Sequence, residues 1–155
     1  MSRNASDGAR YVGAPKPPME YRSPQTADYE CIRTFLVEHG WQHRVSDPER
    51  FRRLMENTDR SVVAVEAGRI VGFARALCDD VSNGYISMVA VAEDRRRQGI
   101  GRELVSRIIG TDPEITWILR AGRQSAGFWR KLGFQPSELA MEKVRQLQAP
   151  TGREP

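Results

Sequence analysis

The stretch that decides the fold is VAVAEDRRRQGIGREL, from Val89 to Leu104. It starts as an alternating apolar run, which is typical of a strand, and ends at the start of an apolar-periodic helix. Two acids, three consecutive arginines and Gly-Ile-Gly lie between them. A strand that passes into a helix through a glycine-containing turn leaves several backbone N–H groups at the helix start without a partner. These N–H groups need an acceptor.

Two common phosphate-binding loops do not fit this turn. A P-loop has a lysine followed by Ser or Thr after its second glycine, whereas Gly101 is followed by Arg102 and Glu103. A dinucleotide-binding loop needs a third small residue where this chain has Leu104. Two interpretations are left. One is a pyrophosphate cradle made by the N–H groups of residues 97–102, and the other is a plain turn with solvated arginines.

Composition places the chain among soluble proteins of one domain. Its 155 residues are 39% hydrophobic and 28% charged, with a formal net charge of +4. We expect a cytoplasmic protein without a membrane segment, because no apolar run is long enough to span a bilayer. Residues 1–18 and 148–155 read as flexible tails around a single domain, residues 19–147. The mild basic excess suits anionic small molecules and also weak nucleic-acid contact.

The pattern along the chain predicts a mixed α/β sheet with helices on its faces. Helices are expected where apolar residues recur at helical spacing, and strands where they alternate. Expected helices cover 27–41, 46–57, 99–110 and 125–133. Expected strands cover a hairpin over 61–78 that turns at 66–69, then 85–92 after a turn over 79–84, then 115–119 and 139–145, with a short first strand at 19–22.

Two motifs in this order resemble the GNAT superfamily of acyl-CoA-dependent N-acyltransferases. The first matches its R/Q-x-x-G-x-G/A signature through Arg96, Gly99 and Gly101, after the aliphatic strand Met88–Val91. The second, SAGFWRKLGF, is similar to the A-x-x-F-Y-x-K-x-G-F segment of the superfamily. It matches through Ala126, Phe128 (displaced by one), Lys131, Gly133 and Phe134. The resemblance extends from about Tyr21 to Arg145.

This resemblance implies a GNAT-like fold and acetyl-CoA as co-substrate. The fold would be a central, mostly antiparallel sheet of six to seven strands with about four helices. A V-shaped split between the strand ending at Val91 and the strand 115–119 would hold the co-substrate, and no metal is expected. The implied cofactor-binding residues are Val89, Ala90, Val91, Arg96, Arg97, Gln98, Gly99, Ile100, Gly101, Arg102, Ser125, Phe128 and Trp129.

The implied reaction is direct acetyl transfer to a primary amine of a small molecule or a protein. The N–H near Val89 would stabilise the oxyanion. Trp129 stands where the superfamily commonly has the tyrosine that protonates the thiolate, and an indole N–H is not an acid at working pH. Tyr85 is the alternative acid, with Ser125 and Cys78 as weaker ones. The candidate bases are Asp79, first, and then Asp80 and Glu30.

The acceptor and the assembly are less well defined by the residues. Trp41 and Arg44 are candidates for an acceptor pocket, through stacking and through pairing with a carboxylate, although Trp41 also suits a structural role. Because Trp129 replaces the usual acid, a catalytically silent acyl-CoA-binding module is the alternative to an enzyme. Nucleic-acid binding is disfavoured, since aromatic residues are not interleaved with the arginines. A homodimer stays open, because small domains with an exposed terminal strand often pair.

Overall fold

The computed structural model describes residues 13–146, and these form two compact units that divide after Arg120. The first unit contains one sheet and four α-helices. The second contains one helix, α5 (Ala126–Lys131), and is described by itself. The expected tails lie largely outside the described residues, apart from residues 13–18, which are exposed and irregular.

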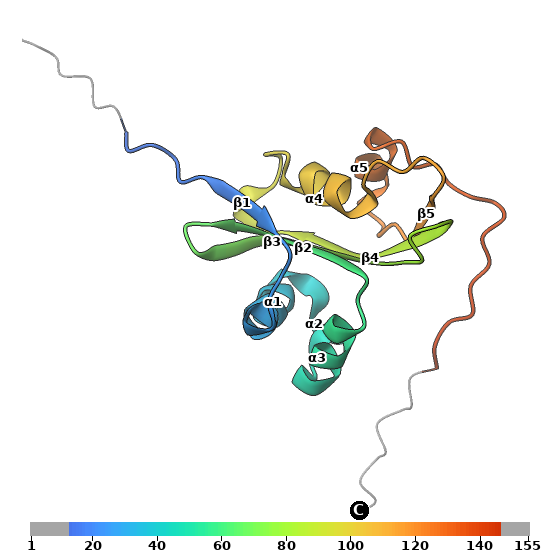
Figure 1. Ribbon diagram of the computed structural model, residues 1–155, viewed down its shortest axis with the longest axis horizontal. Coiled ribbons are helices and arrows are strands. Elements are labelled where there is room, and N and C mark those ends of the chain that lie inside the picture. The colour runs from blue at the N-terminus through green and yellow to red at the C-terminus, as the bar shows by residue number, and fades with distance from the viewer. Residues whose placement is uncertain (1–12, 147–155) are drawn as a thin grey trace, which may run out of the picture. The chain divides into compact units, whose positions relative to one another are not determined.

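The sheet of the first unit has five strands in the order β1-β2-β3-β4-β5 (Figure 1). Three neighbouring pairs of strands are antiparallel, and the pair β4–β5 is parallel. The sheet is therefore mostly antiparallel. The expected number of six to seven strands is too high for the described residues. The strands are β1 (Met19–Arg22), β2 (Arg60–Glu66), β3 (Arg69–Cys78), β4 (Asn83–Val91) and β5 (Thr116–Leu119).

Helices cover both faces of this sheet. Figure 1 shows α1 (Tyr29–Leu36), α2 (Gln42–Val45) and α3 (Pro48–Glu56) on one face, and α4 (Ile100–Ile109) on the other. Their buried apolar residues, such as Ile32 and Phe35 in α1 and Leu104 and Ile108 in α4, form the core with the strands. Shorter helical turns occupy Thr26–Asp28, Val37–Trp41 and Glu93–Arg95.

The helix predicted over 46–57 is confirmed as α3, and its start has a clear cause. The Asp47 carboxylate caps the helix by accepting the N–H of Arg50 at 2.9 Å, and Pro48 occupies the first turn, where a missing N–H costs nothing. The helix predicted over 27–41 is confirmed in its first part as α1, and Gly40, which the sequence indicates as its stop, has φ +90°. A wider turn over Val37–Trp41 follows α1 and leads to the short helix α2.

The sequence pattern predicted the position of the β2–β3 turn correctly, but not the position of the β3–β4 turn. The β2–β3 turn is confirmed: Ala67 (φ 49°) and Gly68 (φ 75°) are both left-handed, as a two-residue hairpin turn requires. The β3–β4 connection was expected to turn at Asn83-Gly84, but these residues already belong to β4. Asp80, with φ 60°, makes the turn instead.

The last strand predicted, over 139–145, does not form. These residues are irregular, and Leu139, Met141 and Val144 are exposed. A strand needs a neighbouring edge for its hydrogen bonds, and the described part of the second unit contains no strand that offers one. The alternating pattern of residues 139–145 was therefore not enough to show whether a strand forms there.

Two glycines allow close packing inside the sheet unit. At Gly72 in β3, a Cβ atom would lie 2.9 Å from Leu104 Cδ1, so α4 approaches the strand backbone directly. At Gly84 in β4, a Cβ atom would lie 2.3 Å from the indole ring of Trp117 in β5. The indole covers the β4 backbone where β4 and β5 pair, at Gly84↔Trp117. The β4–β5 contact therefore depends on a residue without a side chain.

We predict that Gly84→Ala destabilises the protein by about 2 kcal/mol, because the new methyl group overpacks against the Trp117 ring. Gly127→Ala is the matched control, since a Cβ atom there meets nothing within 4 Å and alanine favours a helix. Urea unfolding of both variants measures the difference. Equal midpoints for the two variants would contradict the packing argument.

Candidate active site

Strand β4 has unequal neighbours along its two edges. On one side it pairs with β3 from Gly84 to Val91. On the other side its pairing with β5 covers only residues 83–86. The last five residues, Ser87–Val91, have no strand neighbour on that edge among the described residues. The pairing stops there because β5 itself ends at Leu119, the partner of Ile86. The split that the family resemblance implies stays a prediction.

A β-bulge follows the last residue of β4 that pairs with β5. In the β3–β4 register Arg75 lies opposite Met88 while the next residue, Ala76, lies opposite Ile86, so Ser87 is the extra residue of β4. A bulge bends its strand and redirects the side chains beside it, and bulges are frequent near active sites. The irregularity in β4 therefore lies at the start of its open edge.

The backbone beyond the bulge offers hydrogen-bond donors on its open edge. Ala92 donates its N–H to the carbonyl of Val71 at 2.8 Å, toward β3. Because successive residues of an antiparallel strand point their N–H groups to opposite sides, the N–H of Ala90 also faces β3. The N–H groups of Val89 and Val91 therefore face the open edge. These are two of the three β4 residues predicted from the sequence to bind the co-substrate.

The turn after β4 exposes a run of free amides. Among the described residues, no acceptor takes a hydrogen bond from the backbone N–H groups of residues 97–102. The turn is left-handed at Arg97 (φ 61°) and at Gly99 (φ 81°), which precedes α4 without any side-chain cap. Such uncapped amides at a helix start attract anions. This is the geometry that a pyrophosphate cradle requires.

The arginines of the turn have different roles. Arg95 is structural: its Nε donates at 2.6 Å to Glu66 Oε2, a carboxylate buried at the end of β2. Arg96, Arg97 and Arg102 are exposed beside the free amides. Three side chains of the cluster are therefore available to an anionic ligand.

Lys16 extends the positive charge of this turn. Its Nζ donates at 2.9 Å to the side-chain oxygen of Gln98, so the chain before β1 lies against the turn. The motif identified in the sequence does not include Lys16, because only folding brings residue 16 to residue 98.

Three side chains gather beside the bulge on the sheet face that α1–α3 cover. Arg75 Nη1 donates to Ser87 Oγ at 3.0 Å. Tyr85 lies opposite Leu77 in β3, two residues along the strand from Arg75, and opposite Ile118 in β5. The alternative acid predicted from the sequence is thus near the end of the β4–β5 pairing.

Each acidic candidate is bound to other groups of the protein. The Asp79 carboxylate accepts the N–H groups of Val81, Ser82 and Asn83 at 2.7–2.9 Å, and these bonds hold its pKa well below the usual range. Such a carboxylate is a weak base. Asp80 is paired with Arg60, and Glu30 with Arg33.

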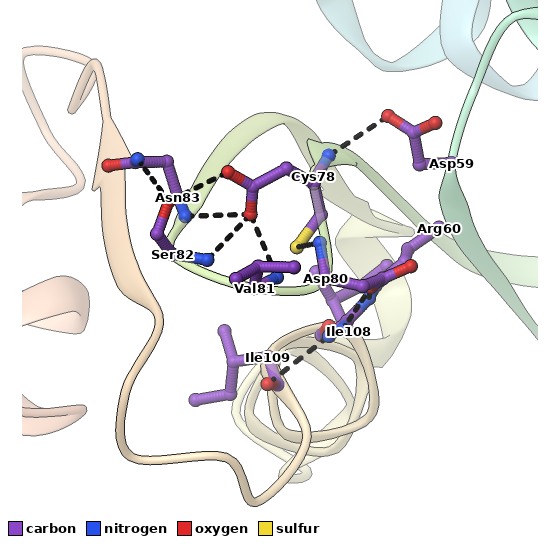
Figure 2. A network of polar contacts seen from close by, with 10 residues as sticks. Asp59, Arg60, Cys78, Asp80, Val81, Ser82, Asn83, Ile108 and Ile109 are labelled. Atoms are coloured by element: carbon purple, nitrogen blue, oxygen red, sulfur yellow. Dashed lines mark hydrogen bonds and ion pairs between the residues drawn. The ribbon is translucent and has the colours of Figure 1, made fainter.

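Figure 2 shows the network around this loop. Arg60 Nη2 donates to Asp80 Oδ1 at 2.5 Å, and its Nη1 donates to the carbonyls of Ile108 and Ile109 at the end of α4. The N–H of Cys78 donates to Asp59, while Cys78 Sγ accepts the N–H of Asp80. Asp79, Asp80 and Cys78 therefore hold the β3–β4 connection in place.

The remaining co-substrate candidates belong to the second unit. Ser125 precedes α5 and donates its hydroxyl to the carbonyl of Gly122 at 3.1 Å. Trp129 is buried, with edge contacts to Phe128 (ring centroids 4.9 Å apart) and to Phe134 (5.4 Å). The indole therefore has a packing role within this unit, and its part in co-substrate binding stays a prediction.

The acceptor candidates lie after α1. Trp41 ends the wide turn over Val37–Trp41, and the Arg44 guanidinium lies 5.6 Å from the centre of its ring. Both belong to the segment on the same sheet face as Tyr85 and Ser87. The contact shows that they are neighbours, while binding of an acceptor by them stays a prediction.

Sequence analysis overlooked Arg75. It stands inside the alternating apolar strand β3, and its side chain is only 6% exposed. A charged residue at a core position of a strand is a signal in itself, because isolated buried charges are costly.

Comparison with known proteins identifies the family. Residues 57–136, just over half of the chain, match the model of the acetyltransferase (GNAT) domain. The chain belongs to the GNAT acetyltransferase family. It is 30% identical over 120 residues to serotonin N-acetyltransferase 2, chloroplastic, from Oryza sativa subsp. japonica. That alignment covers 73% of this chain and 59% of the rice protein, so the chain spans less than two thirds of this relative.

Solved structures share the fold. A predicted acetyltransferase with acetyl-CoA from Clostridium acetobutylicum matches with a TM-score of 0.65 and 18% identity, covering 82% of this chain and 96% of that one. AAC(6′)-Iy in complex with the bisubstrate analogue CoA-S-monomethyl-acetylneamine matches with a TM-score of 0.67 and 18% identity, covering 84% and 99%. At these identities the likeness concerns the fold.

Residues 13–146 contain neither a candidate metal site nor a candidate membrane-spanning helix. No three or more His, Cys, Asp or Glu side chains are grouped as a metal site would require. No helix in this range combines the length and the apolar character needed to cross a bilayer.

We predict that the Asp79 carboxylate stabilises the fold in a pH-dependent way. Its pKa is lower in the folded protein, so its contribution is present above the unfolded pKa of about 3.9 and is lost as the pH falls through the folded pKa. Asp79→Ala should therefore lower the melting temperature at pH 7, and the difference from the parent protein should shrink below about pH 4. Thermal melts across this pH range measure it. A difference that does not change with pH would contradict the ionic contribution of Asp79.

Proposed function

We propose that this protein is an acetyl-CoA-dependent N-acetyltransferase that transfers the acetyl group directly to a primary amine. The observation that carries the proposal is the combination, in one unit, of an open β4 edge and a run of free amides at the following turn. Both are parts of one continuous segment, residues 87–102. Family membership supports the general reaction class.

The free amides fit the pyrophosphate of the co-substrate. Within residues 13–146, no group accepts a hydrogen bond from the six consecutive N–H groups of residues 97–102, and the first turn of α4 adds its positive end. Arg96, Arg97 and Arg102 supply matching charge at the same turn. The open edge of β4 then suits an extended chain that carries its own amide groups, which would hydrogen-bond like an added strand.

The backbone also supplies the electrostatic part of catalysis. In the proposed reaction the amine nitrogen bonds to the carbonyl carbon, the carbon–sulfur bond breaks, the amine loses a proton and the thiolate leaves. Negative charge develops on the carbonyl oxygen, and the open-edge N–H of Val89 is placed to donate to it. A preorganised donor of this kind usually contributes most in acyl transfer.

Tyr85 is the proposed acid for the thiolate. It stands two residues before the bulge residue Ser87, in the part of β4 that pairs with β5, and Ser87 and Arg75 nearby are polar. Trp129 has no acidic proton and packs between two phenylalanine rings, so it is a poor alternative. None of the three carboxylates considered as bases suits that role, since each is engaged by arginine or by backbone amides. We propose that the amine binds in its neutral form or loses its proton to water.

We predict that Gly101→Glu weakens binding of coenzyme A at least about tenfold. A carboxylate in the first turn of α4 competes for the free amides and repels phosphate, while it favours the helix itself, so folding should not suffer. Titration calorimetry with coenzyme A measures the affinity.

Ser106→Glu is the matched control for this variant. It adds the same charge to an exposed position of α4 beyond the first turn, and its affinity for coenzyme A should stay within about twofold of that of the parent protein. The proposal fails if the parent protein shows no binding, or if both variants lose affinity equally.

We also predict that Tyr85→Phe lowers kcat about 100-fold while the affinity for coenzyme A is unchanged. The substitution removes only the hydroxyl group and keeps the ring. Release of free thiol in the presence of an amine panel measures turnover. An unchanged kcat would exclude Tyr85 as the acid. Coenzyme A binding with no turnover in the parent protein would support the silent acyl-CoA-binding module instead of an enzyme.

A further inference from the structure

Arg75 is a buried guanidinium that has no carboxylate in an ion pair among the described residues. Its Nε donates to Thr58 Oγ1 at 3.0 Å and its Nη1 donates to Ser87 Oγ at 3.0 Å. Both acceptors are neutral hydroxyl groups. The charge of Arg75 is therefore hydrogen-bonded but not compensated by a direct anionic partner.

One end of the guanidinium is still available. Nη2 donates to no described group, yet it is absent from the side-chain atoms that are both fully buried and unpaired, so it keeps contact with solvent. The two bonded nitrogens fix the plane of the group. Arg75 thus presents an oriented, unused donor from an otherwise buried side chain, 6% exposed.

The surroundings increase the positive potential at this point. Burial lowers the pKa of Arg75, and repulsion by Arg44 lowers it further, whereas the Asp59 carboxylate attracts the guanidinium. The Asp59 carboxylate is itself bound to the N–H of Cys78 at 2.9 Å. Arg75 and Arg44 bring two positive charges to this region, which favours an anion there.

The position of Arg75 relates this anion site to the proposed reaction. Arg75 lies opposite Met88 and bonds to the bulge residue Ser87, two residues from the proposed oxyanion donor at Val89. Tyr85, the proposed acid, is its other neighbour on β4. An acceptor held by Arg75 would therefore stand next to the reacting carbonyl group.

We propose that Arg75 binds a carboxylate of the acceptor, so that the preferred substrates are amines that also carry a carboxylate, such as amino acids. This inference rests on the proposed acetyltransferase function. It makes Arg75 a residue that determines specificity, through a charge-assisted hydrogen bond, with Arg44 adding to the potential. The carboxylate would accept a hydrogen bond from Nη2, which has no partner among the described residues.

The experiment compares two acceptors that differ only in this carboxylate. Serotonin, the amine in the name of the rice relative, and 5-hydroxytryptophan share the same ring and amine, and phenethylamine and phenylalanine form a second pair. For the parent protein we expect kcat/KM to be about ten- to a hundredfold higher for the carboxylate-bearing member of at least one pair. Equal or lower values for both carboxylate-bearing members would overturn the inference.

Arg75→Gln then tests the residue itself. Glutamine can still donate to a hydroxyl group but carries no charge, so the preference for the carboxylate should disappear, mainly through KM, while kcat/KM for the neutral amine changes by less than about threefold. Arg75→Lys keeps the charge without the planar fork and should retain part of the preference. Arg52→Gln, an exposed arginine of α3, is the control and should change neither value.

The readouts separate the possible failures. Calorimetry with coenzyme A tests the co-substrate site independently, and absence of binding would overturn the proposed function together with this inference. Turnover of both acceptors with an unchanged preference in Arg75→Gln would overturn the inference alone. If Arg75→Gln does not fold, as a circular dichroism melt would show, the Arg75→Lys variant and the preference of the parent protein still decide it.

Discussion

The constraint on which the rest of this structure depends is the unequal pairing of β4. Its β3 edge is hydrogen-bonded along the strand, whereas its β5 edge is paired only over residues 83–86. The indole of Trp117 packs on Gly84 within the paired part of β4 and β5, and the bulge at Ser87 follows that part. An edge strand normally invites unwanted pairing. Here the open edge is only five residues long and lies inside the sheet order, which suits a ligand better than another protein strand.

The polar network of the sheet unit fixes the ends of the elements that border this opening. Arg60 joins the start of β2, the end of α4 and the β3–β4 connection, and its guanidinium also lies 5.3 Å from the centre of the Trp117 ring. Arg95 joins the turn after β4 to Glu66 at the end of β2. Both arginines are engaged within the protein. The turn therefore keeps its left-handed residues and free amides without using its own remaining arginines to do so.

The hydrogen-bond partners of these arginines differ from those of Arg75, and this difference indicates a role for Arg75 in ligand binding. Where an arginine of this unit serves the structure, a carboxylate or a helix-terminal carbonyl accepts its hydrogen bonds. Arg75 is more buried than Arg60 or Arg95, and its hydrogen bonds go to the hydroxyl groups of Thr58 and Ser87. A buried charge is tolerated when it is fully hydrogen-bonded or when a ligand completes its partners. The open nitrogen beside the bulge points to the second case.

Local patterns in the sequence determined those features that depend on neighbouring residues. They include the capped start of α3 at Asp47, the left-handed hairpin turn at Ala67-Gly68, and the passage from β4 through Gly99 into α4. Each depends on backbone preferences within a few positions, so the sequence pattern was sufficient to predict it. The motif around Gly99 and the one around Lys131 were also sufficient to predict the family.

Only the tertiary structure decided which residues meet across the sheet. The run over 139–145 alternates like a strand but is irregular, and the Asp79 carboxylate, predicted as a base, accepts hydrogen bonds from the amides of its own loop. The engagement of Arg95 by Glu66, and the burial of Arg75 beside Ser87, depend on strand register. Register and pairing are long-range choices made by the whole core, so no local pattern in the sequence reports them.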